Sequence, residues 1–454
     1  MTDSMNLISA QISFLEAHLA LIHIPIELYA LSLQPILRLL FGEDHDEDAA
    51  KISWTNRHDF LNISITAIEC SIICSRHLAD RFVRPVADVL NKLYANNKKG
   101  KPKGEIQIGS EDYIVIQVDG QGLDAGQRVL ELTSPLAMAG ISIFFITTYF
   151  SDYILVPFRS RGTVTRALQQ RGFVFSKTAD AFVSQLSPSS PTLLQGGGAR
   201  SPFYDNSAPT TPPAKDIPEL QLRTFKKLKQ NNIRPFVDGN IRLATCAGSR
   251  EYNVANDERL KNDLLQVLLA TAAATPPPTG TSGQPATISS TVFGMGASPA
   301  PLEAPTAELD FGAKFLSLTI TSSEPISVLL ERRLLDRLGG SLLGAKSADD
   351  VLIPITLDLR DLPLDATGIV CGVAGRLAQG STDLPDQEVT LGFTPRAPSS
   401  SMTTEIAHAP DEPVEISFLS TARAGTVIVR ASQLEKALDA LDYGMMRVGD
   451  TDRP

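Results

Sequence analysis

The residue types that most often carry metal or acid–base chemistry are not grouped in this sequence. The six histidines are His18, His23, His45, His58, His77 and His408, and none stands at metal-ligand spacing with a cysteine or carboxylate. His45 lies in the acidic stretch EDHDEDAA, which lacks the glycine and the bidentate glutamate of a calcium-binding loop. We therefore expect a solvated acidic loop there and no metal site.

Motifs for phosphate binding and nucleophilic catalysis are also missing. The glycines Gly196 to Gly198 are not followed by Lys-Ser or Lys-Thr, so they do not form a phosphate loop. We find no nucleophile elbow and no catalytic dyad. After the modules and linkers described below are subtracted, no segment is large enough for a catalytic domain. The sequence therefore predicts a protein that is not an enzyme and has no cofactor.

Charge and composition argue against nucleic acid and membrane as partners. A net charge of -10 and a pI near 5.2 would repel a phosphate backbone. The longest apolar-rich windows, such as Leu264 to Thr275, are too short to cross a bilayer, and the first residues do not resemble a secretory signal. Four cysteines are few for 454 residues, which suits a reducing compartment. We expect a cytoplasmic protein.

Two stretches rich in Pro, Gly, Ser and Thr, within residues 179–216 and 275–308, have the composition of linkers. Between them, the apolar residues of Asp257 to Ala270 stand at helical spacing, so we expect one helix inside a linker that spans residues 179–308. Ser-Pro and Thr-Pro pairs in the first stretch suggest phosphorylation by proline-directed kinases. The linker divides the chain into two halves.

The half before the linker contains a complete β-α-β-β-α-β order. YIVIQV, from Tyr113 to Val118, predicts a buried strand, and Gly140 and Gly172 are placed to end two amphipathic helices. ISIFFITTYFSDYILV, from Ile141 to Val156, predicts the central hairpin. Its strands are apolar at both parities, so we expect one face to pack on the helices and the other to be covered as well.

The half after the linker repeats this hairpin. Alignment of Ile141 with Val414, an offset of 273 residues, sets ISIFFITTYFSDYILV against VEISFLSTARAGTVIV with four identities. TGIVCGV, from Thr367 to Val373, predicts the strand before the repeated hairpin, and ASQLEKALDALDYG predicts the helix after it.

A less regular unit precedes each of these modules. Ile12 to Ile24, LSLQPILRLLF and the pair FLNISIT and CSIIC predict a strand, a helix and a hairpin. FLSLTIT, EPISVLLERRLLDRL and the pair SLLGA and VLIPITL predict the same series in the second half. The sequence thus predicts an α+β protein with four tandem ferredoxin-like modules in two halves. The modules span residues 6–100, 105–178, 309–365 and 366–445, the last with a polar insertion at 381–413.

The central hairpin with its flanks, AGISIFFITTYFSDYILVPF, resembles the CASTOR family of cytosolic arginine sensors, which are built from four ACT domains. That family's second domain has a hydrophobic strand, then Ser/Thr-Thr-Tyr, a polar turn with Asp, and an Ile-Leu-Val strand. Gly368, Ile369 and Val370 are similar to the strand that opens its fourth domain. The resemblance is closest over residues 113–176. It implies ACT-like modules, a small amino-acid ligand and a role in nutrient signalling to the TOR pathway.

The resemblance implies an amino-acid site between the second and fourth modules. The family's ligand contacts fall here on Ser142, Ile143, Gly368, Ile369, Val370 and Thr421. A hydroxyl and backbone N–H groups can hold an α-carboxylate, and a glycine permits close approach of the backbone. Alternatively, Ser142 is an ordinary strand serine and Gly368 a β-bulge glycine.

The turn of the fourth module departs from the family where the guanidinium of arginine would bind. The family has an aromatic residue and an aspartate there, whereas this sequence has Ala422 and Gly425. Because a carboxylate–guanidinium contact contributes about 1.5–3 kcal/mol, arginine is a doubtful ligand. Arg423 in the same turn either favours an anionic or neutral ligand or is a solvated surface residue.

The resemblance also implies a partner-binding turn. The family contacts the GATOR complex through a Tyr, a Gln and an Asp, whose positions are Tyr149, Phe150 and Asp152 here. Alternatively, Tyr149 is a core residue and Asp152 a turn former. An exposed Phe150 would favour a partner or a homodimer interface. Two functions remain open: an amino-acid sensor, or an ACT-domain scaffold that has lost ligand binding.

Overall fold

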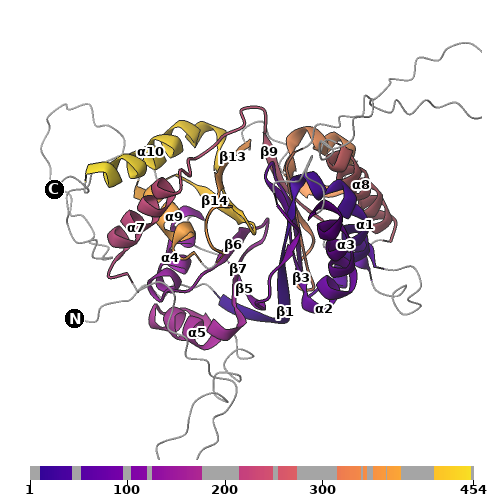
Figure 1. Cartoon of the computed structure of the whole chain (residues 1–454), viewed down its shortest axis with the longest axis horizontal. Helices are drawn as coiled ribbons and strands as arrows, with labels where there is room; N and C mark the ends of the chain where they lie inside the picture. The colour runs from indigo at the N-terminus through magenta and orange to yellow at the C-terminus, as the bar shows by residue number, and fades with distance from the viewer. Residues whose placement is uncertain are drawn as a thin grey trace, which may run out of the picture. The chain divides into compact units, whose positions relative to one another are not determined.

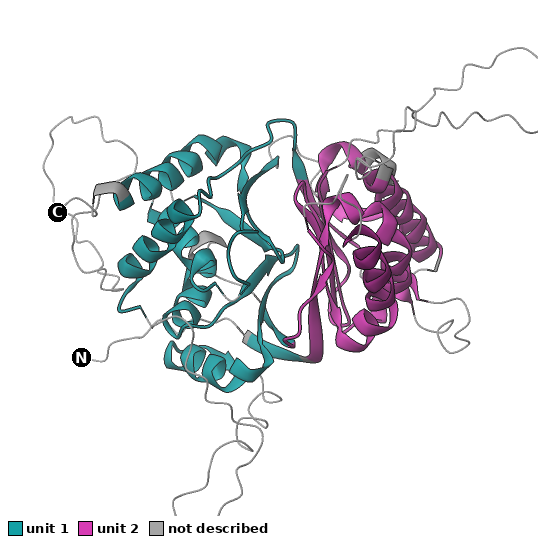
Figure 2. Cartoon of the chain, in the orientation of Figure 1, with its two compact units in different colours: residues 1–16, 113–243, 346–454 teal, residues 17–112, 244–345 magenta. Residues whose placement is uncertain are grey.

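The structure is a computed structural model, and it describes residues 11–42, 53–95, 104–119, 125–175, 214–248, 254–273, 314–338, 341–344, 351–364, 366–379 and 414–450. The chain forms two compact units (Figure 2). Unit 1 comprises residues 1–16, 113–243 and 346–454, and unit 2 comprises residues 17–112 and 244–345. The insertion predicted at 381–413, the acidic stretch around His45 and the Ser-Pro and Thr-Pro pairs lie outside the described residues.

Unit 1 contains the predicted β-α-β-β-α-β order (Figure 1). Its elements are β5 (Tyr113–Asp119), α4 (Ala125–Met138), β6 (Phe144–Thr147), β7 (Ser151–Pro157), α5 (Arg161–Gln170) and β8 (Val174–Phe175). Gly140 and Gly172 follow the two helices with φ of 70° and 89°, a left-handed conformation that favours glycine. The order and both helix ends are confirmed.

The second part of unit 1 repeats the hairpin. It consists of β13 (Leu352–Asp358), α9 (Ile369–Gln379), β14 (Ile416–Ser420), β15 (Ala424–Arg430) and α10 (Leu434–Asp450). Phe145 pairs with Ile154 in the first hairpin, and Phe418 pairs with Val427 in the second. The offset of 273 residues therefore maps one register onto the other, and the internal repeat is confirmed.

The prediction of a strand at TGIVCGV is wrong, because these residues lead into helix α9. The first strand of this repeat is β13, which the sequence pattern had placed in the preceding module. Helix α9 is buried from Ile369 to Leu377 and has no polar face. A short apolar run of this kind cannot be assigned to a strand or a buried helix by periodicity alone.

Both faces of the β6–β7 hairpin are buried, as predicted. The strands of unit 1 follow the order β5-β7-β6-β14-β15-β13, with antiparallel neighbours. Phe145 and Ile154 on one face join a core with residues of α4, α9 and α10. Ile146 and Tyr153 on the opposite face are each 1% exposed.

Unit 2 has the same strand arrangement, β1-β3-β2-β10-β11-β9. Its first elements are β1 (Gln11–Pro25), α1 (Leu33–Phe41), β2 (Phe60–Ile65), β3 (Glu69–Ser75), α2 (Arg76–Leu78), α3 (Arg84–Ala95) and β4 (Gln107–Ile108). They are followed by β9 (Leu243–Gly248), α8 (Val254–Ala273), β10 (Leu316–Thr321), β11 (Ser327–Glu331) and β12 (Leu342–Gly344). Strand β1 begins in unit 1, where Gln11 and Ile12 pair with β8.

The prediction of a linker over residues 179–308 is wrong for the part that the structure describes. Besides the expected helix, which is α8, this part contains α7 (Ile217–Gln230) and β9. The start of α7 has a recognisable signal: the Asp216 carboxylate accepts the N–H of Glu219 at 2.8 Å, and a proline occupies the first turn. The helix predicted at EPISVLLERRLLDRL is also wrong, since its first part is β11 and its second a 3-10 helix, Arg332–Leu338.

Candidate functional site

Each unit joins its two hairpins edge to edge, and the two junctions differ. In unit 2, strands β2 and β10 pair along their whole length, from Ile65 with Leu316 to Phe60 with Thr321. In unit 1, strands β6 and β14 pair through a single residue pair among the described residues, Ile146 with Leu419. We call the β2–β10 junction the unit 2 seam and the β6–β14 junction the unit 1 seam.

Side-chain hydroxyls replace backbone carbonyls in the unit 1 seam. The N–H of Phe145 donates to Ser420 Oγ at 3.0 Å, and the N–H of Phe418 donates to Thr147 Oγ1 at 3.0 Å. Because a hydroxyl extends beyond the backbone, it can bridge strands that do not approach closely enough for a regular ladder. The unit 1 seam is therefore the less tightly paired of the two.

The unit 2 seam adds a neutral polar network to its ladder. Asn62 Nδ2 donates to Thr319 Oγ1 at 3.1 Å and to Ser317 Oγ at 3.3 Å, and Ser64 Oγ donates to Asn62 Oδ1 at 2.8 Å. All four side chains are buried. Their polar atoms pair with one another, so this seam is closed by its own residues.

The structure brings the predicted ligand residues to one end of the unit 1 seam. Ser142 and Ile143 directly precede β6, and Thr421 directly follows β14. Because the two strands are antiparallel, these three residues lie at the same end of the seam. Gly368, with Ile369 and Val370, leads into α9. The segment that leads from β13 to Gly368 starts at this end, because Asp358 ends β13 opposite Ala424, and Arg423 of the β14–β15 turn donates to the carbonyl of Leu362.

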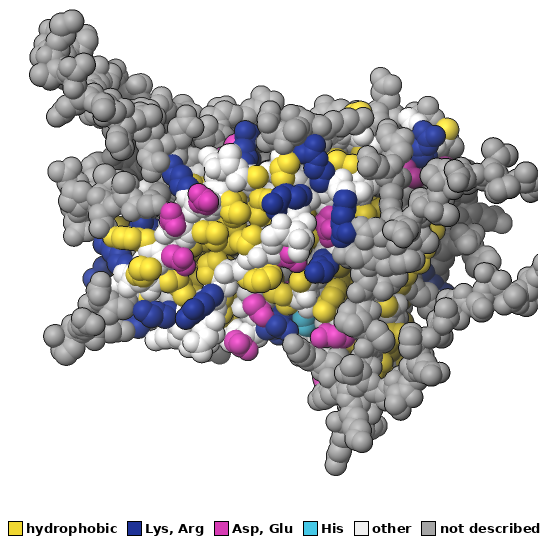
Figure 3. All heavy atoms as spheres, turned by 90° about the horizontal axis from the view of Figure 1, so that it is seen from above, with side chains coloured by type: hydrophobic (Ala, Val, Ile, Leu, Met, Phe, Trp, Pro, Cys, Tyr) yellow, Lys and Arg dark blue, Asp and Glu magenta, His cyan; other side chains and the backbone are white. Residues whose placement is uncertain are grey.

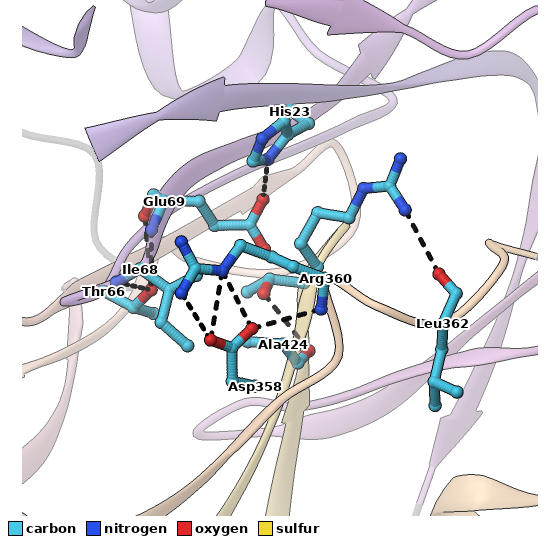
Figure 4. A network of polar contacts seen from close by, with 10 residues as sticks. His23, Thr66, Ile68, Glu69, Asp358, Arg360, Leu362 and Ala424 are labelled. Atoms are coloured by element: carbon cyan, nitrogen blue, oxygen red, sulfur yellow. Dashed lines mark hydrogen bonds and ion pairs between the residues drawn. The ribbon is translucent and has the colours of Figure 1, made fainter. Parts of the chain in front are cut away.

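Thr421 already has a structural role in its own turn. Its N–H and its hydroxyl both donate to the carbonyl of Ala424, at 2.9 and 3.2 Å. Thr148 makes the same hydroxyl bond to Ser151 at 2.7 Å, and Thr66 makes it to Glu69 at 3.3 Å. Figure 4 includes the turn at Thr66, where the N–H groups of Ile68 and Glu69 donate back to the hydroxyl. A threonine at this position is thus explained by turn geometry.

Gly368 is held by the packing of α7 on α9, which excludes the β-bulge interpretation. Its φ is 83°, its carbonyl accepts a hydrogen bond from Thr224 Oγ1 at 3.0 Å, and a Cβ there would lie 2.9 Å from Leu220 Cδ1. A Cβ at Gly372 would lie 2.3 Å from Thr224 Oγ1, so α7 packs directly against the backbone of α9. The glycines of α9 are needed for this close approach.

The remaining predicted ligand residues offer one hydroxyl and helix N–H groups. The side chains of Ile369 and Val370 are buried in the unit 1 core, and Ile143 packs against it. The backbone N–H groups of Ile369 and Val370 lie in the first turn of α9, where helices provide no carbonyl partner. Ser142 is half-buried, and its hydroxyl makes no hydrogen bond with the described part of the chain.

The β14–β15 turn has apolar surroundings where the family has an aspartate. A Cβ at Gly425 would lie 3.6 Å from Leu359 Cδ1 and from the Phe418 ring, an ordinary van der Waals contact. Ala422 is buried. Arg423 is half-buried, and its Nη1 donates to the carbonyl of Leu362 at 3.3 Å, so it tethers the segment between β13 and α9.

The residues of the predicted partner-binding turn differ in exposure. Tyr149 is 45% exposed, and its ring contacts the half-buried ring of Phe150 edge-on at 4.9 Å. Asp152 lies in β7 and is 0% exposed. The prediction that the Asp152 side chain reaches a partner is therefore wrong, as is its interpretation as a simple turn former.

Asp152 instead forms a buried ion pair that sequence reasoning missed. Arg128 of α4 donates from Nε to Asp152 Oδ2, and Thr147 contributes a second hydrogen bond to the carboxylate. Burial raises the pKa of Asp152, and this effect exceeds the opposing effects of Arg128 and Thr147. Arg128 stands 24 residues before Asp152 on the polar side of a predicted helix, and no local motif links the two.

Other kinds of site find little support in the described residues. Within them, no group of three or more His, Cys, Asp or Glu side chains could hold a metal ion, and no helix is long and apolar enough to cross a membrane. His23 Nδ1 lies 2.5 Å from Glu69 Oε2 in unit 2, a buried pair visible in Figure 4. On the face seen in Figure 3, basic and acidic side chains are interspersed among hydrophobic ones.

Comparison with known families identifies part of unit 1. Residues 109–170 match the ACT domain family. The matched stretch runs from just before β5 to the end of α5 and includes the β6–β7 hairpin. ACT domains commonly bind small molecules such as amino acids in regulation. The family match and the order of elements together support an ACT-domain, ferredoxin-like fold with mixed helix and strand content.

Solved structures are similar to this chain only at low identity. The protein Atu0741 from Agrobacterium tumefaciens is 16% identical with a TM-score of 0.23, and the match covers 37% of this chain and 92% of that protein. Aspartate kinase from Synechocystis is 11% identical with a TM-score of 0.27, and the match covers 97% of this chain and 56% of the kinase. No curated protein sequence matches the chain.

Proposed function

We propose that this chain is a non-enzymatic, cytoplasmic regulatory protein with two ACT-like modules in each unit, and that it binds a small amino acid at the unit 1 seam. The observation that carries the proposal is the sparse pairing of β6 with β14, next to a fully paired counterpart in unit 2. Strands that are joined by one residue pair and two side-chain hydroxyls, in place of a continuous ladder, leave room for a ligand between them.

Ser142 and the start of α9 provide the chemistry for a carboxylate. The Ser142 hydroxyl and the N–H groups of Ile369 and Val370 are donors at the same end of the seam. The N-terminus of a helix carries a partial positive charge, which favours an anion. Ile143 and the backbone around Gly368 and Thr421 line the rest of the proposed ligand site. The apolar surroundings of Gly425 favour a ligand with a neutral side chain over arginine.

The exposed turn at Tyr149 is the proposed contact for a protein partner in nutrient signalling to the TOR pathway. Tyr149 lies on the turn that joins β6 to β7, and β6 is one strand of the seam. A ligand that binds the seam can change this turn only if it prefers one of two conformations. Loss of partner binding in Tyr149→Ala, with amino-acid binding unchanged, is the expected result in affinity purification.

A thermal-shift panel of the twenty amino acids on the full chain tests the proposed ligand site. We expect one amino acid, or one chemical group of them, to raise the melting temperature by several degrees near saturation. Ser142→Ala should lose this shift, whereas Ser160→Ala, a half-buried serine elsewhere in unit 1, should retain it. A flat panel from folded protein would contradict ligand binding.

The alternative is a scaffold that has lost its ligand, and specific contacts favour it. The Thr421 hydroxyl is used in its own turn, and the Gly368 carbonyl is used by Thr224. If the chain is such a scaffold, we expect that no amino acid shifts the melting temperature and that Tyr149→Ala still abolishes partner binding.

A further inference from the structure

One buried carboxylate oxygen in unit 1 has no donor. Asp152 is 0% exposed, and its Oδ1 atom has no hydrogen-bond partner among the described residues, whereas Oδ2 is held by Arg128. An acceptor buried without a donor is destabilising, and more so when the group is ionised. Such an atom in a folded protein is usually completed by a bound molecule or a water.

Hydrogen bonds link this carboxylate to the unit 1 seam. The Asp152 carboxylate bonds Thr147 of β6, and Thr147 Oγ1 accepts the N–H of Phe418 from β14. Asp152 alternates with Tyr153 along β7 and therefore shares a face with Ile154, which packs in the core beneath the helices. The free oxygen lies at the opposite end of the seam from Ser142, because Thr147 ends β6 and Ser142 precedes it.

The repeat shows that this feature belongs to one hairpin alone. The register places Gly425 at the position of Asp152, since Thr147 pairs with Asp152 and Ser420 pairs with Gly425. Leu359 and Phe418 surround Gly425, so an ionic group is absent from that position of the described second hairpin. The two ends of the seam thus have different chemistry: one offers donors for a carboxylate, and the other a carboxylate acceptor.

We propose that Asp152 forms a second ligand position at the unit 1 seam, where Oδ1 accepts an N–H from the ammonium group of a small amino acid. Arg128 holds the carboxylate in place by donating to Oδ2. An ammonium group provides both a donor and a compensating charge, which water does not. This inference rests on the proposed amino-acid function and adds a separate position, because the length of β6 lies between Ser142 and Thr147 and one α-amino acid cannot reach both ends with its carboxylate and ammonium groups.

Calorimetric titration of the full chain tests the proposal with three sets of probes. These are the twenty amino acids, their α-amides, which keep the ammonium group, and their N-acetyl derivatives, which lack it. We expect the α-amide of at least one amino acid to bind at the Asp152 position, because it keeps the ammonium group and lacks the carboxylate that the Ser142 end would hold, and we expect no binding of the N-acetyl derivative at that position. Asp152→Asn should weaken binding of the amide about tenfold or more.

Thr426→Val is the matched control for Asp152→Asn. Thr426 lies in the second hairpin, is 0% exposed and also has an unpartnered buried oxygen, but it carries no charge. Its replacement should leave affinity unchanged. Equal affinity of wild type and Asp152→Asn for the amide would overturn the proposal and indicate that water completes Oδ1. If Ser142→Ala still lost binding in that case, the proposed function would stand.

A measurement on the unaltered protein covers the case in which Asp152→Asn does not fold. Hydrogen exchange with the bound amino acid should slow in peptides that contain Thr147 and Asp152. Slowing confined to peptides of the β14–β15 hairpin would overturn the second position. Absence of binding by every probe to folded wild type would overturn both the inference and the proposed function.

Discussion

The two seams show how one strand arrangement can be closed or open. The unit 2 seam is a regular ladder from Phe60 to Ile65, reinforced by the neutral network of Asn62. The unit 1 seam has one backbone pair, and two hydroxyls replace the rest of the ladder. Position in the fold is therefore not enough to make a ligand site. The side chains at the junction decide whether the two strands form a continuous ladder or are bridged by hydroxyls with room for a ligand between them.

The polar groups near the two seams also differ in charge. Asn62, Ser64, Ser317 and Thr319 are neutral, so the unit 2 seam is insensitive to protonation. The unit 1 seam ends at an ion pair between Arg128 and a fully buried Asp152. A buried ion pair contributes little net stability but is costly to break on one side.

Arg128→Met should have the largest effect on stability. It leaves the Asp152 carboxylate buried without a cation, which costs about 3–5 kcal/mol of unfolding free energy. Urea unfolding at neutral pH measures this loss. The double variant Arg128→Met/Asp152→Asn is the control, because it removes both charges and should recover most of the stability. An equal loss in both variants would mean that Arg128 acts through packing and not through charge.

Gly372→Val should have the next largest effect. Helix α9 is buried in the unit 1 core, and the added Cβ would fall 2.3 Å from Thr224 Oγ1, so α7 must shift. Overpacking of this kind costs about 2–3 kcal/mol. Gly162→Ala in α5 is the control, since nothing lies within 4 Å of its Cβ, and it should stabilise the helix slightly. Equal unfolding midpoints for the two variants would contradict the close packing of α7 on α9.

Asn62→Ala tests the closed seam. It leaves the buried partners Ser64 and Ser317 without their shared amide, and we expect a loss of about 2 kcal/mol in unfolding free energy. Asn56→Ala, an exposed asparagine of unit 2, should change stability by less than about 0.5 kcal/mol. Amino-acid binding should be unaffected by either change. A loss of amino-acid binding in Asn62→Ala would contradict the proposal that the ligand site lies at the unit 1 seam alone.

Ser420→Ala tests the open seam with a smaller effect. The N–H of Phe145 loses its acceptor, which costs about 1 kcal/mol by chemical denaturation. Ser417→Ala, a half-buried serine on the same strand, is the control and should be close to neutral. Indistinguishable losses would show that the hydroxyl bridge does not contribute to the seam.

The pH dependence should be the smallest effect. Because burial raises the pKa of Asp152 in the folded state, the native protein binds this proton more tightly than the unfolded chain does. The resulting stability is present below the unfolded pKa and is lost as pH rises through the folded pKa. The unfolding free energy of wild type, relative to Asp152→Asn, should therefore increase as pH falls below neutral. A decrease over the same range would contradict the direction of the shift.

Much of the fold was predictable wherever the pattern was local. The structure contains both hairpins in the predicted apolar segments, the helix-ending glycines Gly140 and Gly172, and the offset of 273 residues. The failures occur where burial removes the pattern. Helix α9 is buried from Ile369 to Leu377 because α7 and neighbouring elements surround it, so its largely apolar sequence looks like a strand.

The site was less predictable than the fold because its decisive contacts are distant in sequence. The order of strands explains why Ser142 and Thr421 meet, and the family resemblance had implied a site that includes both. The ion pair of Arg128 with Asp152, the docking of α7 on Gly368 and the turn bond of Thr421 depend on tertiary packing. Tyr149 is exposed and Asp152 is buried although they are three residues apart, because Tyr149 lies in the turn and Asp152 lies in β7.

Hydrogen exchange of the full chain, with and without the amino acid that gives the largest thermal shift, tests the central claim most directly. The account predicts slower exchange in peptides that contain β6 and β14, and unchanged exchange in peptides that contain β2 and β10. Equal slowing at both seams, or slowing at the unit 2 seam alone, would contradict the proposal that the open seam of unit 1 is the ligand site.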